Sequence, residues 1–178
     1  MLQFLANAID NPLRRKIQPP DKTAIRHGIK EGMNVLEIGP GNGRYTIEAA
    51  RQVGQNGKVT TIDIEERMIE RVKNRMKNEG IKNIETQVAN VYKLPYQDNS
   101  FDLIYMIAVF NEIPHQGDAL KEFYRVLKPK GLLVFSELLL DPDYPLAKTL
   151  IGKVEKYPFR LKEKIGNFFH YTLKFEKI

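Results

Sequence analysis

Three glycines stand at alternate positions, Gly39, Gly41 and Gly43, directly after the short apolar run "VLEI". Glycine weakens regular structure, so its repeated use at one point favours backbone that bends sharply or lies against another molecule. Glu37 comes just before these glycines, and Asp63 comes near the end of the next apolar run. A carboxylate at the second position can accept two hydrogen bonds from a ribose diol, and one at the first can hold an ammonium group.

Two phosphate-binding patterns are absent at these glycines. The dinucleotide fingerprint G-x-G-x-x-G fails because Arg44 stands where the third glycine is required after Gly39. The P-loop pattern fails because no Lys-Ser or Lys-Thr pair follows. The residues therefore predict a ligand that has a ribose and a cationic amino-acid group but no phosphate, a description that fits S-adenosylmethionine.

The elements around these residues alternate between strand and helix patterns. Apolar, partly β-branched runs predict strands over residues 34–39, 58–64, 84–90, 101–110 and 131–139, and helical spacing predicts helices over residues 45–53, 67–78 and 118–127. Asp118 is the predicted N-cap of the third helix, and "KPKG" its stop signal. Such alternation indicates βαβ units with a parallel sheet between helices.

The pattern changes after Leu140. Residues 141–159 predict a loop and a helix, and residues 160–178 predict two strands joined through Gly166 and Asn167. We therefore expect an α/β, Rossmann-like three-layer sandwich whose seven-stranded, mostly parallel sheet has a C-terminal antiparallel hairpin at one edge. We expect one domain over residues 1–178, with an N-terminal arm or lid (1–31), a cofactor-binding core (32–140) and a C-terminal extension (141–178).

Composition excludes several kinds of chemistry. The absence of cysteine excludes disulfides, thiolate metal sites and cysteine nucleophiles, and three scattered histidines without ligand spacing make a metal site an unfavourable prediction. No apolar run approaches membrane-spanning length, so we expect a cytoplasmic protein. The net charge of +6 belongs to the two ends: residues 11–30 carry six basic side chains against one acidic, and residues 151–178 carry seven against three.

The order of motifs over residues 32–137 resembles the class I S-adenosylmethionine-dependent methyltransferases, particularly the small-molecule branch of ubiquinone and menaquinone biosynthesis. "VLEIGPGNGRYT" looks like that family's first motif and "VTTIDIEERMIERVK" like its second. "VANVYKLPYQDNSFDLIYMIAVFNEI" and "ALKEFYRVLKPKGLLVFSE" resemble the segments around its fourth and fifth strands. The resemblance implies S-adenosylmethionine as cofactor and methyl transfer to a small molecule, with no metal.

The resemblance also implies roles for individual residues. The backbone around the three glycines would lie against the methionine part, Asp63 would bind the ribose hydroxyls, and Ile64 would cover one adenine face. Asn90 and Val91 would address the adenine edge, although the family usually has Asp where Asn90 stands. Tyr45 would close over the methionine part, and the predicted cofactor set also includes Glu37 and Ile107.

Structural roles compete with these assignments. Glu37 can cap helix amides, and Asp63 can be the N-cap of the helix that follows. Ile64 and Tyr45 can be core residues, and Asn90 can be a turn residue. The glycine loop itself can be a tight turn without a ligand.

The chain offers one histidine near the expected acceptor position. His115 follows the fourth predicted strand and is a candidate general base because its ordinary pKa lies near neutrality. Asn111 and Glu112 share that loop as further candidates. Methyl transfer needs a base only when the acceptor must lose a proton, so the sequence need not contain a catalytic dyad.

Two functions compete with small-molecule methylation. The basic ends leave RNA or protein methylation open, although nucleic acid is the less favoured partner, and the Asn90 departure leaves open a cofactor-binding subunit that needs another chain. Arg14, Arg15 and Lys16 can hold an anionic substrate, or can join the apolar residues Leu2, Phe4, Leu5 and Leu13 in a peripheral membrane contact. The oligomeric state is not predicted.

Overall fold

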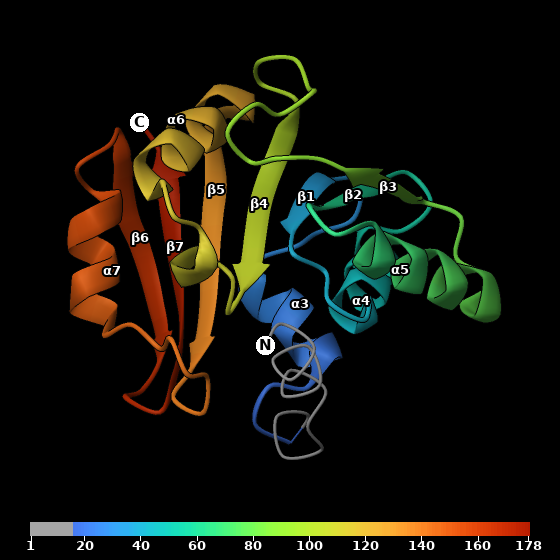
Figure 1. Ribbon diagram of the computed structural model, residues 1–178, viewed down its shortest axis with the longest axis horizontal. Helices are drawn as coiled ribbons and strands as arrows, with labels where there is room; N and C mark the ends of the chain where they lie inside the picture. Colours follow the sequence, from blue (N-terminus) through green and yellow to red (C-terminus); the bar gives the residue numbers. More distant parts are fainter. Residues whose placement is uncertain (1–15) are drawn as a thin grey trace.

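The computed structural model describes residues 16–178 and places their seven strands in one sheet with the order β3-β2-β1-β4-β5-β7-β6 (Figure 1). The strands β1 to β5 run parallel, and β7 runs antiparallel to both of its neighbours. The elements are α3 (Pro20–His27), β1 (Asn34–Ile38), α4 (Arg44–Val53), β2 (Lys58–Asp63), α5 (Glu66–Glu79), β3 (Ile84–Val88), β4 (Phe101–Ile107), η1 (Phe110–Glu112), α6 (Gln116–Val126), β5 (Leu127–Leu138), α7 (Ala147–Val154), β6 (Phe159–Gly166) and β7 (His170–Lys177).

Both faces of the central strands are buried. In β1, Leu36 belongs to one hydrophobic cluster and Val35 to another, because successive side chains of a strand point to opposite faces. In β4, Met106 and Tyr105 divide between the same two clusters. This double burial accounts for the nearly continuous apolar sequence of these strands.

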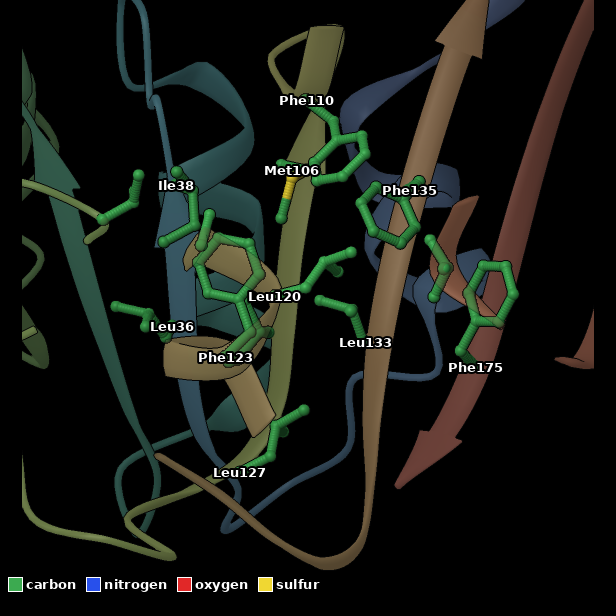
Figure 2. Close-up of a cluster of buried hydrophobic side chains, with 14 of the residues drawn as sticks. Leu36, Ile38, Met106, Phe110, Leu120, Phe123, Leu127, Leu133, Phe135 and Phe175 are labelled. Carbon is green, nitrogen blue, oxygen red and sulfur yellow. The ribbon is translucent and has the colours of Figure 1, made fainter. Parts of the chain in front are cut away.

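Helices cover each face of the sheet. Figure 2 shows one cluster, in which Phe123 of α6 packs among Leu36, Leu133 and other strand residues, and α7 adds Leu150 to it. The second cluster contains buried residues of α3, α4 and α5, which therefore lie against the other face. The predicted three-layer α/β architecture is confirmed.

The boundaries of three elements differ clearly from their predictions. Strand β4 ends at Ile107 and not at residue 110, because the chain turns at Ala108, which has a left-handed φ of 55°. Helix α6 begins at Gln116 with His115 as its N-cap residue, so Asp118 lies in the first turn and forms an ion pair with Lys121 at 3.0 Å. Strand β5 begins at Leu127, so the "KPKG" segment is part of a strand with an irregular register against β4. Lys130 adopts a left-handed φ of 63° within this irregular stretch.

The C-terminal hairpin lies where it was predicted. Strand β7 pairs with β5 on one side and β6 on the other, and β6 forms one edge of the sheet. The edge strand exposes Lys162 and Lys164, and charged side chains of this kind discourage pairing with another chain. In residues 16–178, no helix is long and apolar enough to cross a membrane.

A buried polar chain fixes α3 against the sheet. His27 Nε2 lies 2.8 Å from the hydroxyl of Ser136 in β5, and that hydroxyl lies 2.8 Å from the hydroxyl of Thr172 in β7. Burial, with Lys174 and Arg26 as further causes, lowers the pKa of His27 to about 3. The ring is therefore neutral at physiological pH and serves to connect three elements.

Candidate active site

A cavity of about 580 Å³ opens at the carboxyl ends of the parallel strands. This is the edge at which open α/β sheets bind ligands. Its wall is mostly apolar and comes from the loops after β1 to β5 together with the start of α5. It is lined by Gly39, Gly41, Ile62, Asp63, Ile64, Glu65, Met68, Ala89, Asn90, Val91, Tyr92, Val109, Glu112, Ile113, Pro114 and Asp143.

The loop that contains Gly39 and Gly41 forms part of the cavity wall. Gly39 and Gly41 have φ values of 70° and 56°, in the left-handed region that favours glycine. A Cβ on Gly39 would lie 2.6 Å from Cγ2 of Val109, whereas one on Gly41 would meet no protein atom within 4 Å. The loop is held from α5, where Arg75 Nε donates to the carbonyl of Asn42 at 2.8 Å. The backbone at Gly41 therefore lies bare against the cavity.

The second predicted segment also reaches the cavity. Asp63 ends β2 and lines the wall, and one of its carboxylate oxygens accepts a hydrogen bond from the Glu65 amide at 2.9 Å. Helix α5 begins at Glu66 with Glu65 as its N-cap residue, so Asp63 is not the cap. Burial raises the pKa of Asp63 above its usual value. Ile64 lines the same wall with 72% of its surface exposed, which excludes core packing.

Asn90 lies in the cavity wall and also forms a turn. It lines the cavity beside Val91, and its side-chain oxygen accepts a hydrogen bond from the Tyr92 amide at 2.9 Å. This bond makes a turn typical of Asn and Asp. Because a carbonyl oxygen has two lone pairs, the turn leaves this oxygen able to accept a second hydrogen bond.

Four predicted cofactor residues do not line the cavity. Gly43 precedes α4, and a Cβ there would lie 3.2 Å from the Cα of Val72, so this glycine permits the approach of α5. Tyr45 donates its hydroxyl hydrogen to the carbonyl of Gln18 at 3.0 Å. Ile107 is buried in the second core cluster, and Glu37 is 2% exposed. Their cofactor roles stay predictions.

Glu37 is a buried acid beneath the glycine loop. Its carboxylate accepts a hydrogen bond of 2.5 Å from the hydroxyl of Thr46 in α4. Burial raises its pKa to about 7, against the lowering effect of Thr46 and of the Tyr105 and Thr61 hydroxyls. The folded protein therefore holds this proton more tightly than the unfolded chain does.

The substitution Glu37→Gln is expected to raise the free energy of unfolding at pH 8 and to leave it unchanged at pH 4. The folded-state pKa of about 7 exceeds the ordinary 4.5. The stabilisation that comes from protonated Glu37 is therefore fully present below pH 4.5 and is lost as the pH rises through 7. The gain at pH 8 is at most about 3 kcal/mol. Urea unfolding at both pH values measures the change in the free energy of unfolding, and the exposed Glu70→Gln is the control. An equal gain at pH 4 and pH 8 would contradict the prediction.

The segment after β4 forms the opposite wall. Val109, Glu112, Ile113 and Pro114 line the cavity, and Glu112 ends the short helix η1. Asn111 ties this segment to the loop after β5, because its side-chain amide donates to the carbonyl of Asp143 at 2.8 Å. Glu112 is therefore the member of the three predicted acceptor-side residues that reaches the cavity.

His115 lies behind this wall. Its backbone amide donates to the Tyr92 hydroxyl at 3.1 Å, and its ring packs edge-on against the Tyr92 ring at 5.7 Å between centroids. His115 is exposed and does not line the cavity. The structure thus brings the predicted base next to a cavity residue without placing it in the wall.

Four carboxylates line the cavity, and none of its described wall residues is Lys, Arg or His. The four are Asp63, Glu65, Glu112 and Asp143. Burial raises the pKa of Glu112, and Asp143, Asp63, Asp141 and Glu65 raise it further. The cavity therefore favours a cationic ligand and disfavours phosphate groups.

Several wall residues were absent from the sequence prediction. Val109 lies near the end of the strand predicted over residues 101–110, and Ile113 and Pro114 follow that strand, so their position at its carboxyl end was the available signal. Met68 has the apolar spacing of a core residue, and nothing in the sequence around Asp143 indicates that its loop returns to the cavity. In residues 16–178, no group of three or more His, Asp and Glu residues could hold a metal ion.

Comparison with known proteins gives one consistent result. A family model described as a methyltransferase domain matches residues 29–172. The ubiquinone/menaquinone biosynthesis C-methyltransferase UbiE of Escherichia fergusonii is 35% identical over 141 residues, which are 79% of this chain. The 141 matched residues are 55% of the length of the relative, so the chain spans about half the length of the curated relatives it matches.

Solved structures agree on the architecture. A SAM-dependent methyltransferase from Aquifex aeolicus superposes with a TM-score of 0.87 at 27% identity and covers 97% of both chains. The [4+2]-cyclase SpnF superposes with a TM-score of 0.78 at 18% identity and covers 89% of this chain and 79% of its own. The second likeness shows the fold alone.

Proposed function

Because the chain belongs to the family of S-adenosylmethionine-dependent methyltransferases, we propose that it methylates a small-molecule acceptor bound in the cavity described above. The observation that carries the proposal is a cavity with the glycine loop at one side, four carboxylates in its wall and no basic residue among its described lining. A cofactor with a ribose, a sulfonium and an ammonium group but no phosphate fits that wall.

Different residues of the cavity wall would bind different parts of the cofactor. Gly39 and Gly41 offer bare backbone for the methionine part, Asp63 offers carboxylate oxygen to the ribose hydroxyls, and Ile64 offers an exposed apolar face to the adenine. Asn90 offers its amide to the adenine edge. When bound, S-adenosylmethionine supplies a methyl group on a sulfonium centre that loses its positive charge on transfer.

The opposite wall would hold the acceptor. Tyr92, Val109, Ile113 and Pro114 provide an apolar surface that excludes water and orients a ring. In net terms the acceptor exchanges one proton for the methyl group, and Glu112 is positioned in the wall to take that proton. Burial and the neighbouring acids raise the pKa of Glu112, and a more basic carboxylate is a better proton acceptor.

The named relatives suggest the acceptor. They are C-methyltransferases of ubiquinone and menaquinone biosynthesis, and this chain spans about half their length. We therefore propose a phenol- or quinol-like ring as the acceptor and a ring carbon as the atom methylated. Such a ring can lose a proton to a carboxylate base and bury its remaining surface against the apolar wall.

Calorimetric titration tests the cofactor. S-adenosylmethionine and S-adenosylhomocysteine are expected to bind, whereas NAD and ATP are not. The Gly41→Ala variant is expected to bind S-adenosylmethionine about tenfold more weakly, because its methyl group would occupy ligand space. Gly80→Ala is the matched control: its φ is also left-handed, at 67°, a Cβ there also meets nothing within 4 Å, and Gly80 lies at the far end of α5.

Both glycine variants are expected to lose similar stability, about 1 kcal/mol each, because both place a side chain in left-handed backbone. Equal loss of S-adenosylmethionine binding in the two variants would contradict the assignment of the glycine loop to the cofactor site. Transfer of a labelled methyl group to phenols and quinols, with RNA and protein as competing acceptors, then tests the acceptor class. Methylation of RNA alone would overturn the small-molecule proposal.

A further inference from the structure

Two carboxylates lie on the acceptor side of the cavity. In the sheet order β3-β2-β1-β4-β5, the loops after β1, β2 and β3 hold the residues proposed for the cofactor, and the loops after β4 and β5 come next along the same edge (Figure 1). These two loops supply Glu112 and Asp143 to the cavity wall. An acceptor bound beside the cofactor therefore lies close to both carboxylates.

The backbone around Asp143 is held in place by two distant side chains. The carbonyl of Asp143 accepts a hydrogen bond from the side-chain amide of Asn111 at 2.8 Å. Two residues later, the carbonyl of Pro145 accepts a hydrogen bond from the hydroxyl of Tyr171 at 2.7 Å. The position of the Asp143 carboxylate is therefore set by the backbone before an acceptor binds.

The charge of Asp143 is available to act on a ligand. Within residues 16–178, neither Asp143 nor Glu112 forms a side-chain hydrogen bond or an ion pair that would neutralise its carboxylate. Burial raises the pKa of Glu112, and Asp143 is the largest of the further causes. The two carboxylates are therefore close enough to repel each other, and each would repel a third negative charge placed beside them.

We propose that Asp143 is a specificity-determining residue that excludes acceptors with an anionic group near the reacting ring, so that the chain takes uncharged rings. This assignment rests on the proposed function, because it concerns the acceptor of that reaction. The apolar residues of the acceptor wall contact any ring of the same shape, so they do not distinguish a neutral ring from a carboxylated one. Like charges placed side by side cost binding energy, and a site can use that cost to discriminate between ligands.

Binding of two matched phenols in the presence of S-adenosylhomocysteine tests the proposal without turnover. The probes 4-hydroxyphenylacetamide and 4-hydroxyphenylacetate have nearly the same shape and differ in charge at neutral pH, and a methylene group separates that charge from the ring. The wild-type Kd, measured by ligand-observed NMR titration, is expected to be at least about tenfold lower for the amide. The ratio of the two Kd values is expected to fall as salt rises, because salt screens repulsion between exposed charges.

Two substitutions of Asp143 measure the effect of its charge. Asp143→Asn removes one unit of charge from a side chain of nearly the same shape and is expected to narrow the ratio about threefold. Asp143→Lys changes the charge by two units and is expected to narrow the ratio about tenfold. Glu31→Gln is the matched control: Glu31 is an exposed acid that precedes β1, at the opposite edge of the sheet, so this variant is expected to keep the wild-type ratio. The thermal midpoint of each variant reports whether it has folded.

Three results would overturn the proposal. They are equal or tighter binding of 4-hydroxyphenylacetate by the wild-type protein, binding of neither phenol, and a ratio that stays at the wild-type value in both Asp143 variants. Tighter binding of 4-hydroxyphenylacetate would instead favour Arg14 and Arg15 as the residues that hold an anionic substrate.

Calorimetric titration with S-adenosylmethionine separates a failure of this proposal from a failure of the proposed function. Cofactor binding without a preference for the amide would keep the cofactor assignment and reject the role of Asp143. A preference for the amide in a chain that does not bind S-adenosylmethionine would keep the specificity of the wall and reject the proposed function.

Discussion

Asp63→Asn is expected to weaken S-adenosylmethionine binding about a hundredfold. The carboxylate would accept two hydrogen bonds from the ribose diol, each worth about 1.5–3 kcal/mol when one partner is charged. Asn keeps an oxygen for the Glu65 amide, which Asp63 bonds at 2.9 Å, but replaces the other oxygen with a donor. Calorimetric titration measures the change, and the thermal midpoint reports whether the turn is intact.

Asp63→Ala separates the ligand role of Asp63 from its role in the turn. This variant loses both the carboxylate and the turn, so it is expected to bind at least as weakly as Asp63→Asn and to be less stable. If Asp63→Asn binds like wild type and only Asp63→Ala fails, the residue acts through the turn. In that case the ribose must be held by another member of the wall, of which Glu65 is the nearest acid in sequence.

Glu112→Gln is expected to lower kcat about a hundredfold while the Kd for S-adenosylmethionine stays within about threefold. The expected hundredfold loss of kcat is the usual contribution of a general base that is positioned against the proton it removes. Burial, together with Asp143, Asp63, Asp141 and Glu65, raises the pKa of Glu112. Because a base must be deprotonated, wild-type kcat/KM is expected to rise with pH as Glu112 loses its proton, and the variant is expected to lose that rise.

His115→Gln is the matched control for Glu112→Gln. His115 is exposed and packs on Tyr92 outside the wall, so this variant is expected to keep turnover within about threefold of wild type. The reverse pattern, with His115→Gln inactive and Glu112→Gln active, would make His115 the base. Unchanged turnover in both variants would indicate an acceptor that reaches the site already deprotonated.

The sequence predicted the parts of the site that depend on local backbone. Gly39 and Gly41 need left-handed φ values, and Asp63 and Asn90 form turns at strand ends, so each leaves a signal within a few residues. The fold was predictable for a related reason: strands buried on both faces have continuous apolar sequence, and the helices between them have helical spacing.

The remaining wall depends on tertiary packing. Asp143 reaches the cavity because its loop is tied to Asn111, which lies 32 residues earlier, and no local pattern predicts such a bond. Glu37 has the motif position of a ligand residue, yet the hydroxyl of Thr46 and the residues around it bury it beneath the loop. The residues of the arm that were predicted to bind substrate or membrane, apart from Lys16, lie outside the described residues.

The position of β7 links the completion of folding to the wall of the cavity. Strand β7 follows β6 along the chain but lies between β5 and β6 in the sheet, so β6 is joined to the sheet only through β7. The same strand contributes Tyr171, Leu173 and Phe175 to the core. Assembly of this edge is therefore cooperative and depends on contacts that are distant in sequence, which form slowly.

The β6–β7 hairpin holds the loop after β5 through two hydrogen bonds. The Tyr171 hydroxyl donates to the carbonyl of Pro145 at 2.7 Å, and the Tyr144 hydroxyl donates to the carbonyl of Phe168. This loop supplies Asp143 to the cavity wall, so a molecule whose β7 has not yet paired would have no fixed position for that wall residue. The cavity is therefore complete only in molecules whose sheet is complete.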